Sequence, residues 1–405
     1  MALKEQFQVS SGYRNWSLAL SGIGLLSVIV GYFVYGTGDE HQVSRFWAAL
    51  LQNSVYFLLV VNAAMFFICA TTLAMGGWQM SFRRVSEAIS VAVVPLGLIA
   101  FIILMVLVFG DHHHIYHWLN PKGDKILEGK SGFLNPTFFT VWTVLSIGLW
   151  IVLGLKMRKL SRELDVRPIQ SVEEGKSYVF KTTVWASIYI VWFALTVAST
   201  TPWLWLMSID AHWFSTMYSW YTFASTFVSG LALITLFVIY LKNKGYLELV
   251  NEEHLHDLGK FIFAFSIFWT YLWFSQFMLI WYANIPEETV YFKPRLQGPY
   301  QGIFWLNLII NFVAPLLILM RRSSKRNYTT LTFMAVFIVF GHWLDFFQMV
   351  FPGPLTDHLP LGIMDFGIAL GFIGLIMYVT GTQLSKHSLY VKNHPFFKET
   401  IIHHT

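Results

Sequence analysis

Apolar runs long enough to cross a lipid bilayer follow one another along nearly the whole of this 405-residue chain. Hydrophobic residues make up 56% of the chain and charged residues 12%, whereas a soluble protein carries about 25% charged residues. A bilayer core of roughly 30 Å needs about 20 apolar residues per helix. Ten segments meet that length: residues 16–36, 48–73, 86–110, 134–156, 181–201, 214–241, 260–284, 301–320, 329–351 and 361–384. Because an open β-sheet cannot satisfy its backbone in lipid, the pattern predicts an all-α, multi-pass integral membrane protein with a single domain over residues 1–405.

Basic residues are concentrated on one side of the predicted membrane domain. If the N-terminus, the even-numbered connections and the C-terminus share a side, that side holds 21 of the 27 Lys and Arg residues. By the positive-inside rule, both termini are then cytoplasmic, and residues 385–405 form a cytoplasmic tail. Since the basic residues lie in loops between spans, the net charge of +5 does not indicate nucleic-acid binding. The polar N-terminus lacks the apolar core of a cleaved signal peptide.

The composition excludes an iron–sulfur cluster and a bis-histidine haem held by this chain alone. Cys69 is its one cysteine, so it forms no internal disulfide and cannot ligate an iron–sulfur cluster, which needs about four thiolates. His342 is the one histidine well inside a predicted span, whereas an integral bis-histidine haem needs paired axial ligands. Asp111 and the histidines that follow it, at 112–114 and 117, have no Cys and no distant partner motif. We expect a hydrated outer loop or a contact with a partner there, and no specific metal site.

The ninth span carries the strongest candidate for chemistry. His342 and Asp345 are three residues apart and therefore share a helix face, which Gln348 extends by another turn. Ionisable groups inside a membrane are costly, so each is a functional candidate by default. A carboxylate beside a histidine can pass a proton or hydrogen-bond a quinone oxygen. The alternative is a satisfied polar contact that holds two helices together.

A second set of candidates lies towards the outer side. Asp210 and His212 precede the sixth span, next to apolar sequence. The seventh span is packed with aromatic residues and contains the uncharged polar Gln276, with Trp269 and Tyr271 on preceding turns. A helix of this composition is expected to face protein, a cavity or a flat ligand, because a lipid-facing helix needs only aliphatic residues and Phe.

Other polar and small residues inside the predicted spans favour structural roles. Asn307 and Asn311 are one turn apart, as expected for contacts between helices. Gly22-x-Gly24 and Gly367-x-x-x-Gly371 predict close helix packing, either within the chain or with a partner subunit. Glu87, near the inner end of the third span, could open the inner half of a proton path or lie at a solvated helix end.

Three segments resemble a known family. They are TPWLWLMSIDAHWFSTMYSWY at 201–221, followed by FVSG at 227–230, then WTYLWFSQFMLIWYANIPEET at 269–289, and GHWLD at 341–345 with FPG at 351–353. Together they resemble the NrfD-like membrane subunits of alternative complex III, a quinol:cytochrome c oxidoreductase. The length, the ten spans and the cytoplasmic termini are more similar to the shorter of its two such subunits, ActF.

The resemblance implies a fold, cofactors and partners. It implies two four-helix bundles, residues 48–201 and 214–351, flanked by the first helix and by the last at 361–384. It implies quinone or quinol, with menaquinol expected, and haem and iron–sulfur centres on partner subunits only. The partners would be a second NrfD-like membrane subunit, a multi-haem cytochrome c subunit, an iron–sulfur subunit, other small subunits and lipid, in a bacterial inner membrane.

The same resemblance assigns roles to the candidate residues. Asp210 and His212 fall in what looks like the family's outer quinone region, to which Gln276, Trp269 and Tyr271 could belong. His342 and Asp345 fall on a helix discussed as part of a proton path, so the leading hypothesis is a non-haem subunit of the oxidoreductase that lines a quinone pocket, a proton path or both.

Two alternatives stay open at this point. One is a scaffold subunit of the same complex with a degenerate quinone site. The other is a secondary transporter, against which stands the absence of a clearly interrupted helix pair at matching positions of two halves.

Overall fold

The computed structural model describes residues 4–110, 112–357 and 359–404, and within them it is all-helical apart from one isolated bridge between Gln6 and Ser388. Ten helices are long and apolar enough to cross a membrane, which confirms the ten predicted spans. They are Ser11–Gly36, Glu40–Leu73, Arg83–Phe109, Pro136–Val166, Val172–Trp205, Met217–Asn243, Glu252–Ala283, Gln301–Leu319, Tyr328–Val350 and Ile363–Leu384.

The helices divide by chain order into a first half, spans two to five, and a second half, spans six to nine. The first half contains α2 (Glu40–Leu73), α3 (Arg83–Ser90), α4 (Val93–Phe109), α6 (Pro136–Val166), α7 (Val172–Leu195) and α8 (Thr201–Trp205). The second half contains α9 (Met217–Asn243), α10 (Glu252–Ala283), α13 (Gln301–Leu308), α14 (Ala314–Leu319) and α16 (Tyr328–Val350). The first and last spans contain α1 (Ser11–Gly31) and α17 (Ile363–Leu384). Short helices in the connections and the tail are α5 (Lys125–Gly129), α11 (Pro286–Thr289), α12 (Lys293–Gln297), α15 (Arg322–Arg326) and α18 (Phe397–Ile401).

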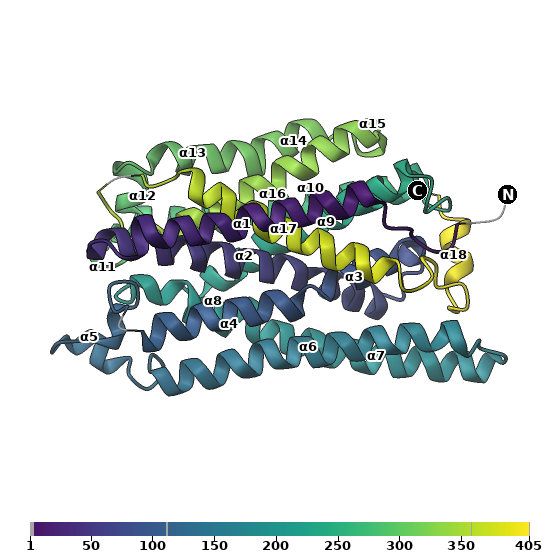
Figure 1. The fold of residues 1–405 in the computed structure, drawn as a ribbon, viewed down its shortest axis with the longest axis horizontal. Coiled ribbons are helices and arrows are strands. Elements are labelled where there is room, and N and C mark those ends of the chain that lie inside the picture. Colours follow the sequence, from purple (N-terminus) through teal and green to yellow (C-terminus); the bar gives the residue numbers. More distant parts are fainter. Residues whose placement is uncertain (1–3, 111, 358, 405) are drawn as a thin grey trace.

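Helix contacts within each half close into a ring. In the first half α2 contacts α4 and α7, while α6 contacts α4 and α7. In the second half α9 contacts α10 and α16, while the eighth span contacts both α10 and α16. α2 also packs against α9 and α16, which joins the halves, and α1 packs along α17 (Figure 1).

Prolines interrupt three of the spans. The third breaks between α3 and α4 four residues before Pro95, and π turns at Thr196–Thr200 (η4) and Ile309–Val313 (η6) precede Pro202 and Pro315. Proline lacks the N–H for the i−4 carbonyl and crowds it, so the helix breaks or widens one turn earlier. The interrupted spans are the second and fourth of the first half and the third of the second half. Among the described residues, no interrupted pair therefore occupies matching positions.

Glycines let α1 and α17 approach closely. A Cβ on Gly24 would lie 2.2 Å from the Cα of Gly371, so neither position accepts a side chain without separating the helices. Gly367 faces Ser27 in the same interface, whereas Gly22 has open space around it. The predicted close packing is therefore confirmed for Gly24, Gly367 and Gly371, and it is made within the chain.

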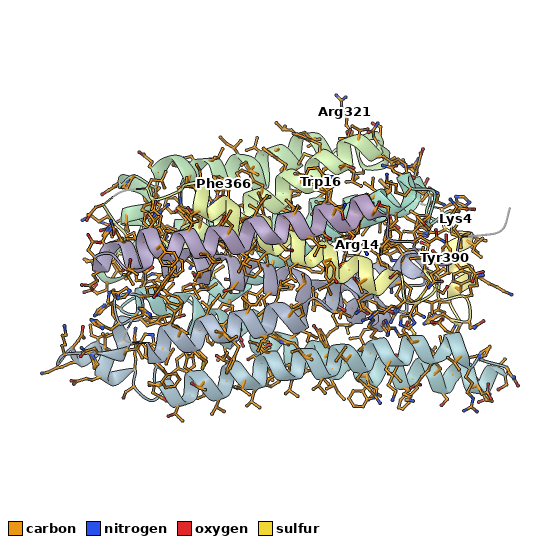
Figure 2. All side chains as sticks on the ribbon, viewed as in Figure 1. Lys4, Arg14, Trp16, Arg321, Phe366 and Tyr390 are labelled. Carbon is orange, nitrogen blue, oxygen red and sulfur yellow. The ribbon has the colours of Figure 1, made fainter. Side chains whose placement is uncertain are left out.

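Both ends of the chain lie at the same end of the molecule, where Lys4 and Tyr390 are found in Figure 2. The Leu389 N–H donates to Glu5 O (2.6 Å), so the N-terminal segment pairs with the tail. The tail then crosses the ends of the spans, where the Thr400 hydroxyl donates to Trp78 O (2.6 Å) and lies 2.8 Å from His254 Nε2. Residues 385–404 are thus packed against the helices.

Candidate functional site

Asp345 is fully buried between α16, α9 and α10. Its Oδ2 accepts hydrogen bonds from the Ser225 hydroxyl (3.0 Å) and from Trp269 Nε1–H (3.0 Å), and its Oδ1 accepts one from the Tyr221 hydroxyl. Tyr221 and Ser225 are four residues apart on α9 and therefore share the face turned to Asp345. Three donors from two neighbouring helices stabilise a carboxylate where lipid-like surroundings would otherwise disfavour it.

His342 is connected to that carboxylate through a hydroxyl. Its Nδ1 lies 3.0 Å from Ser225 Oγ and 3.8 Å from Asp345 Oδ2. Since Ser225 has one hydroxyl proton, which it donates to Asp345, the matching arrangement has the histidine proton on Nδ1. Nδ1–H, the serine hydroxyl and the carboxylate then form a continuous relay along which a proton can move by successive transfers.

Several buried polar atoms of the second half have no hydrogen-bond partner among the described residues. They are His342 Nε2, both amide atoms of Asn311, Asn307 Oδ1, Ser266 Oγ and Gln276 Nε2, all contributed by spans seven to nine. Asn311 lies in the π turn η6 beside Gly341, where an added Cβ would be 2.2 Å from Asn311 Oδ1. Asn311 therefore lies at a helix contact as expected, but its amide hydrogen-bonds none of the described residues. Buried polar atoms in this state commonly bind internal water or a ligand.

Arg295 is buried at the end of the second half that lies opposite the chain termini, which we call the outer end (Figure 1). It lies in α12, is 2% exposed, and donates to Gln348 O (2.9 Å) and Met349 O (3.5 Å) at the C-terminal end of α16. Its Nη2 also lies 3.3 Å from Asp210 Oδ2. A guanidinium at this position satisfies carbonyls that the helix leaves free and complements the negative end of the helix dipole.

Aromatic rings connect the ion pair between Arg295 and Asp210 with Asp345. Arg295 lies 3.5 Å from the ring centroid of Tyr291, which stacks on Trp213 at 4.0 Å. Tyr218 contacts Tyr291 edge-on at 6.1 Å and lies 6.4 Å from Tyr221, the residue that donates to Asp345. Burial raises the pKa of Tyr291 to about 12, so it stays a neutral phenol at physiological pH.

His212, Tyr271 and Gln276 lie apart from the Asp345 cluster. His212 Nε2 is 2.5 Å from Asp124 Oδ2, and this hydrogen bond lowers the pKa of the Asp124 carboxyl. Tyr271 is 62% exposed on the outside of α10, because two residues along a helix turn it away from the buried Trp269. Gln276 is buried on the Trp269 face but two turns further out. Of the predicted site residues, the structure therefore brings together His342, Asp345 and Trp269. Asp210 lies at the outer end of this cluster, where it pairs with Arg295.

A cavity of about 290 Å³ lies next to Asp210 at the outer end, opposite the chain termini. Trp203, Trp213, Phe133 and Phe214 line it together with Lys130. The indole N–H groups of Trp203 and Trp213 are buried and hydrogen-bond none of the described residues. A larger cavity of about 780 Å³, bounded by residues 169–183 and 393–396, lies at the end that carries the termini, so size alone does not mark the site.

Glu87 at the other end is held in ion pairs. It is 2% exposed and accepts from Arg83 Nε (3.2 Å) and Arg84 Nη1 (3.0 Å), so the alternative of a solvated helix end is wrong. Arg84 also binds Asp165 at 2.7 Å. Two guanidinium groups fix this carboxylate in its charged form, which is the arrangement of a structural ion-pair network.

Sequence reasoning did not identify Tyr221, Ser225, Tyr291, Trp213 or Arg295 as members of the site. The i, i+4 spacing of Tyr221 and Ser225 on one face of an apolar helix was an available signal. No comparable signal marked Arg295 and Tyr291, because their burial depends on how a loop folds back over α16. Among the described residues, no group of three or more His, Cys, Asp or Glu side chains is arranged to hold a metal ion.

Comparison with protein-family models and with curated proteins gave no match for this chain. The fold itself defines the class as an all-helical, multi-pass membrane protein. Within that class, its distinguishing feature is a buried carboxylate joined to a histidine and two hydroxyls inside the second half.

Proposed function

We propose that this chain is a non-haem integral subunit of a respiratory quinol:cytochrome c oxidoreductase of the alternative complex III type. In it, Asp345, Ser225 and His342 carry protons, and the chain has the two four-helix bundles of the NrfD-like subunits. The ring-like helix contacts within each half support that arrangement. The observation that carries the proposal is the buried relay from His342 Nδ1 through Ser225 to Asp345.

The chemistry follows from what quinol oxidation releases. Each quinol gives up two electrons and two protons, and a chain without cysteine clusters or paired axial histidines passes the electrons to haem and iron–sulfur centres on partners. The protons need bases at controlled positions. Asp345 has the geometry of such a base. The contacts from Tyr221 through Tyr218 and Tyr291 to Arg295 and Asp210 support a connection with the outer surface.

The outer cavity is our candidate for the quinone head group. Its aromatic walls suit a flat ring, and the unpaired N–H groups of Trp203 and Trp213 suit a quinone carbonyl oxygen. This assignment keeps Asp210 in the pocket region predicted from the sequence but replaces Gln276, Trp269 and Tyr271 as its lining. The proposed setting is a bacterial inner membrane, with a second NrfD-like subunit, a multi-haem cytochrome c and an iron–sulfur subunit as partners.

The test is a mild-detergent purification through a tag on this chain, followed by a reduced-minus-oxidised spectrum and a quinol:cytochrome c assay. We expect haem bands and activity in the eluate. Asp345→Asn should assemble normally and lower turnover or its proton coupling by at least about tenfold. Asn62→Leu, which removes a neutral polar contact of the first half, is the matched control and should leave activity per complex unchanged.

Two other outcomes would redirect the assignment. Loss of assembly in Asp345→Asn, with normal activity in the complex that does form, would favour a scaffold role, for which the complete hydrogen bonding of this carboxylate is the supporting observation. A colourless protein that purifies alone would remove it from a respiratory complex and favour a transporter.

A further inference from the structure

Arginines gather at a cleft near the end of the molecule that carries the termini. Arg158 and Arg162 are four residues apart on α6 and share a face. They line the cleft together with Arg84 and Glu87 of α3 and with Gln383 and His387 from the end of α17 and the segment after it. Arg158 is buried, whereas Arg162, Gln383 and His387 are half-buried and reachable from outside.

The positive charge in this cleft exceeds the negative charge. Arg84 is bound by Glu87 and Asp165, as described above, but Arg158 donates to a neutral acceptor, Gln383 Oε1 (2.7 Å). Among the described residues, neither Arg158 nor Arg162 has a carboxylate oxygen within 4.0 Å. Burying a guanidinium without a counter-ion is costly, so the site is suited to an anion. His387 adds a hydrogen-bonding group, since burial and the neighbouring arginines lower its pKa and keep it neutral.

The depth of these arginines matches the lipid head groups. The α6 residues 136–155 are free of charged side chains, and 20 helical residues span about 30 Å, the thickness of the hydrocarbon core. Arg158 and Arg162 follow directly after this stretch. Their guanidinium groups are therefore level with the phosphates of one leaflet.

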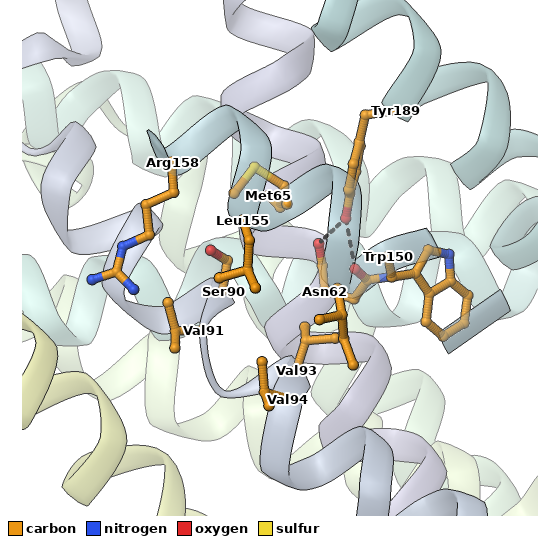
Figure 3. A pocket seen from close by; sticks show the side chains of 12 residues that line it. Asn62, Met65, Ser90, Val91, Val93, Val94, Trp150, Leu155, Arg158 and Tyr189 are labelled. Atoms are coloured by element: carbon orange, nitrogen blue, oxygen red, sulfur yellow. Dashed lines mark hydrogen bonds between the residues drawn. The ribbon is translucent and has the colours of Figure 1, made fainter. Parts of the chain in front are cut away.

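A second, apolar crevice leads from Arg158 into the membrane. Figure 3 shows Arg158 at one edge of it, with Trp150 and Tyr189 at the other. Trp150 lies eight residues earlier on α6, about 12 Å deeper. Val94 and Leu155, which also line the crevice, are 39% and 44% exposed, so it is open to the hydrocarbon. The break between α3 and α4 forms one wall.

We infer that this site binds an anionic phospholipid, with its phosphate held by Arg158 and Arg162 and an acyl chain lying along the crevice towards Trp150. The cleft and the crevice each enclose only about 10 Å³, room for about one water molecule. The lipid therefore lies against the surface between α3, α6 and α17, and only its phosphate oxygens enter the cleft. Basic pockets between spans at this level are suited to such head groups.

Native mass spectrometry of the full chain in detergent tests the inference, with phosphatidylglycerol titrated against phosphatidylcholine. We expect tighter binding of phosphatidylglycerol and about tenfold weaker binding in Arg158→Gln/Arg162→Gln. The matched control Lys159→Gln/Arg167→Gln removes the same charge from two exposed positions, one on α6 and one directly after it, and should leave binding unchanged. Equal affinity of the site variant and the wild type, or an equal loss in the control, would overturn the inference.

Two further measurements cover a double variant that does not fold and an anion that is not a lipid. If the double variant does not fold, the half-exposed Arg162→Gln alone should still weaken phosphatidylglycerol binding severalfold, and unchanged binding there would contradict the proposal. Inorganic phosphate separates the two sources of the anion. If free phosphate at millimolar concentration binds as well as the lipid and displaces it, the site is a phosphate site and the lipid assignment is wrong.

Discussion

The two halves of this molecule fill their interiors with polar groups of different kinds. In the first half, the buried pairs in the middle of the spans are neutral, whereas its buried ion pairs around Glu87 lie at the end that carries the termini. Trp150 Nε1–H donates to Thr196 (2.9 Å), Trp205 Nε1–H donates to Thr143 (3.0 Å), and the Tyr189 hydroxyl donates to Asn62 Oδ1 (2.6 Å). In the second half the equivalent depth holds a carboxylate, Asp345, with a histidine beside it. Each half is built from four spans, so the contrast is between the side chains that two four-span units bury.

The contrast separates polar groups that hold helices together from polar groups that can do chemistry. An indole N–H donating to a threonine hydroxyl has one stable arrangement and no proton to exchange at neutral pH. The Asp345 relay has hydroxyl protons that can shift between partners, and it lies beside polar atoms that have no partner in the described chain. We therefore interpret the first half as scaffold and the second as the part through which protons move.

The largest expected effect comes from placing a carboxylate in the first half. Asn62→Asp would face one donor, Tyr189, where Asp345 has three. We expect a loss of about 5 kcal/mol in stability, since a buried charge with too few partners is several kcal/mol unfavourable. Thermal unfolding and the yield of folded protein in detergent measure it, with Asn62→Leu as the uncharged control. A stable Asn62→Asp protein would mean that the first half tolerates charge as well as the second, and the contrast would fail.

The sequence alone predicted the ten spans because each is a simple run of apolar residues, and the structure extends most of them by several residues into the loops. It also identified His342 and Asp345, since a charge inside such a run is visible without any structure. It could not show that Ser225 bridges them or that Tyr271 faces outward. Those facts depend on the rotation of each helix about its axis, which packing against neighbours decides.

The outer ends of the two halves give the next largest difference. Arg295→Gln would remove the donors to Gln348 O and Met349 O and leave Asp210 without its cation, so we expect a loss of about 3 kcal/mol in stability. In the first half, the corresponding contact between a loop and a helix end is a neutral hydrogen bond, which the Tyr116 hydroxyl donates to Trp205 O (2.8 Å). Tyr116→Phe should therefore cost only about 1 kcal/mol. Equal melting temperatures for the Arg295→Gln and Tyr116→Phe variants would contradict the view that a charged contact stabilises the outer end of the second half alone.

Ser225→Ala and Thr196→Val form the sharpest functional pair. Each removes one buried hydroxyl, and each should lower stability by about 1 kcal/mol. Ser225→Ala also interrupts the relay between His342 and Asp345, so activity per assembled complex should fall by about tenfold or more, whereas Thr196→Val should leave it unchanged. If both variants keep full activity, Ser225 is a packing residue and the proton relay through it is wrong.

The smallest expected effect is a pH dependence at the outer end of the second half. The pKa of Tyr291 is raised by burial to about 12 from the usual 10, so the unfolded chain loses this proton first as the pH rises. The contribution of Tyr291 to the free energy of unfolding is therefore fully present below pH 10 and is lost as the pH rises towards 12. By pH 11 the loss of stability is about 1 kcal/mol. Tyr291→Phe should lose less stability than the wild type between pH 8 and 11 in thermal unfolding. The exposed Tyr271→Phe should follow the wild type, and a Tyr291→Phe protein that did the same would show that burial of this phenol does not control alkaline stability.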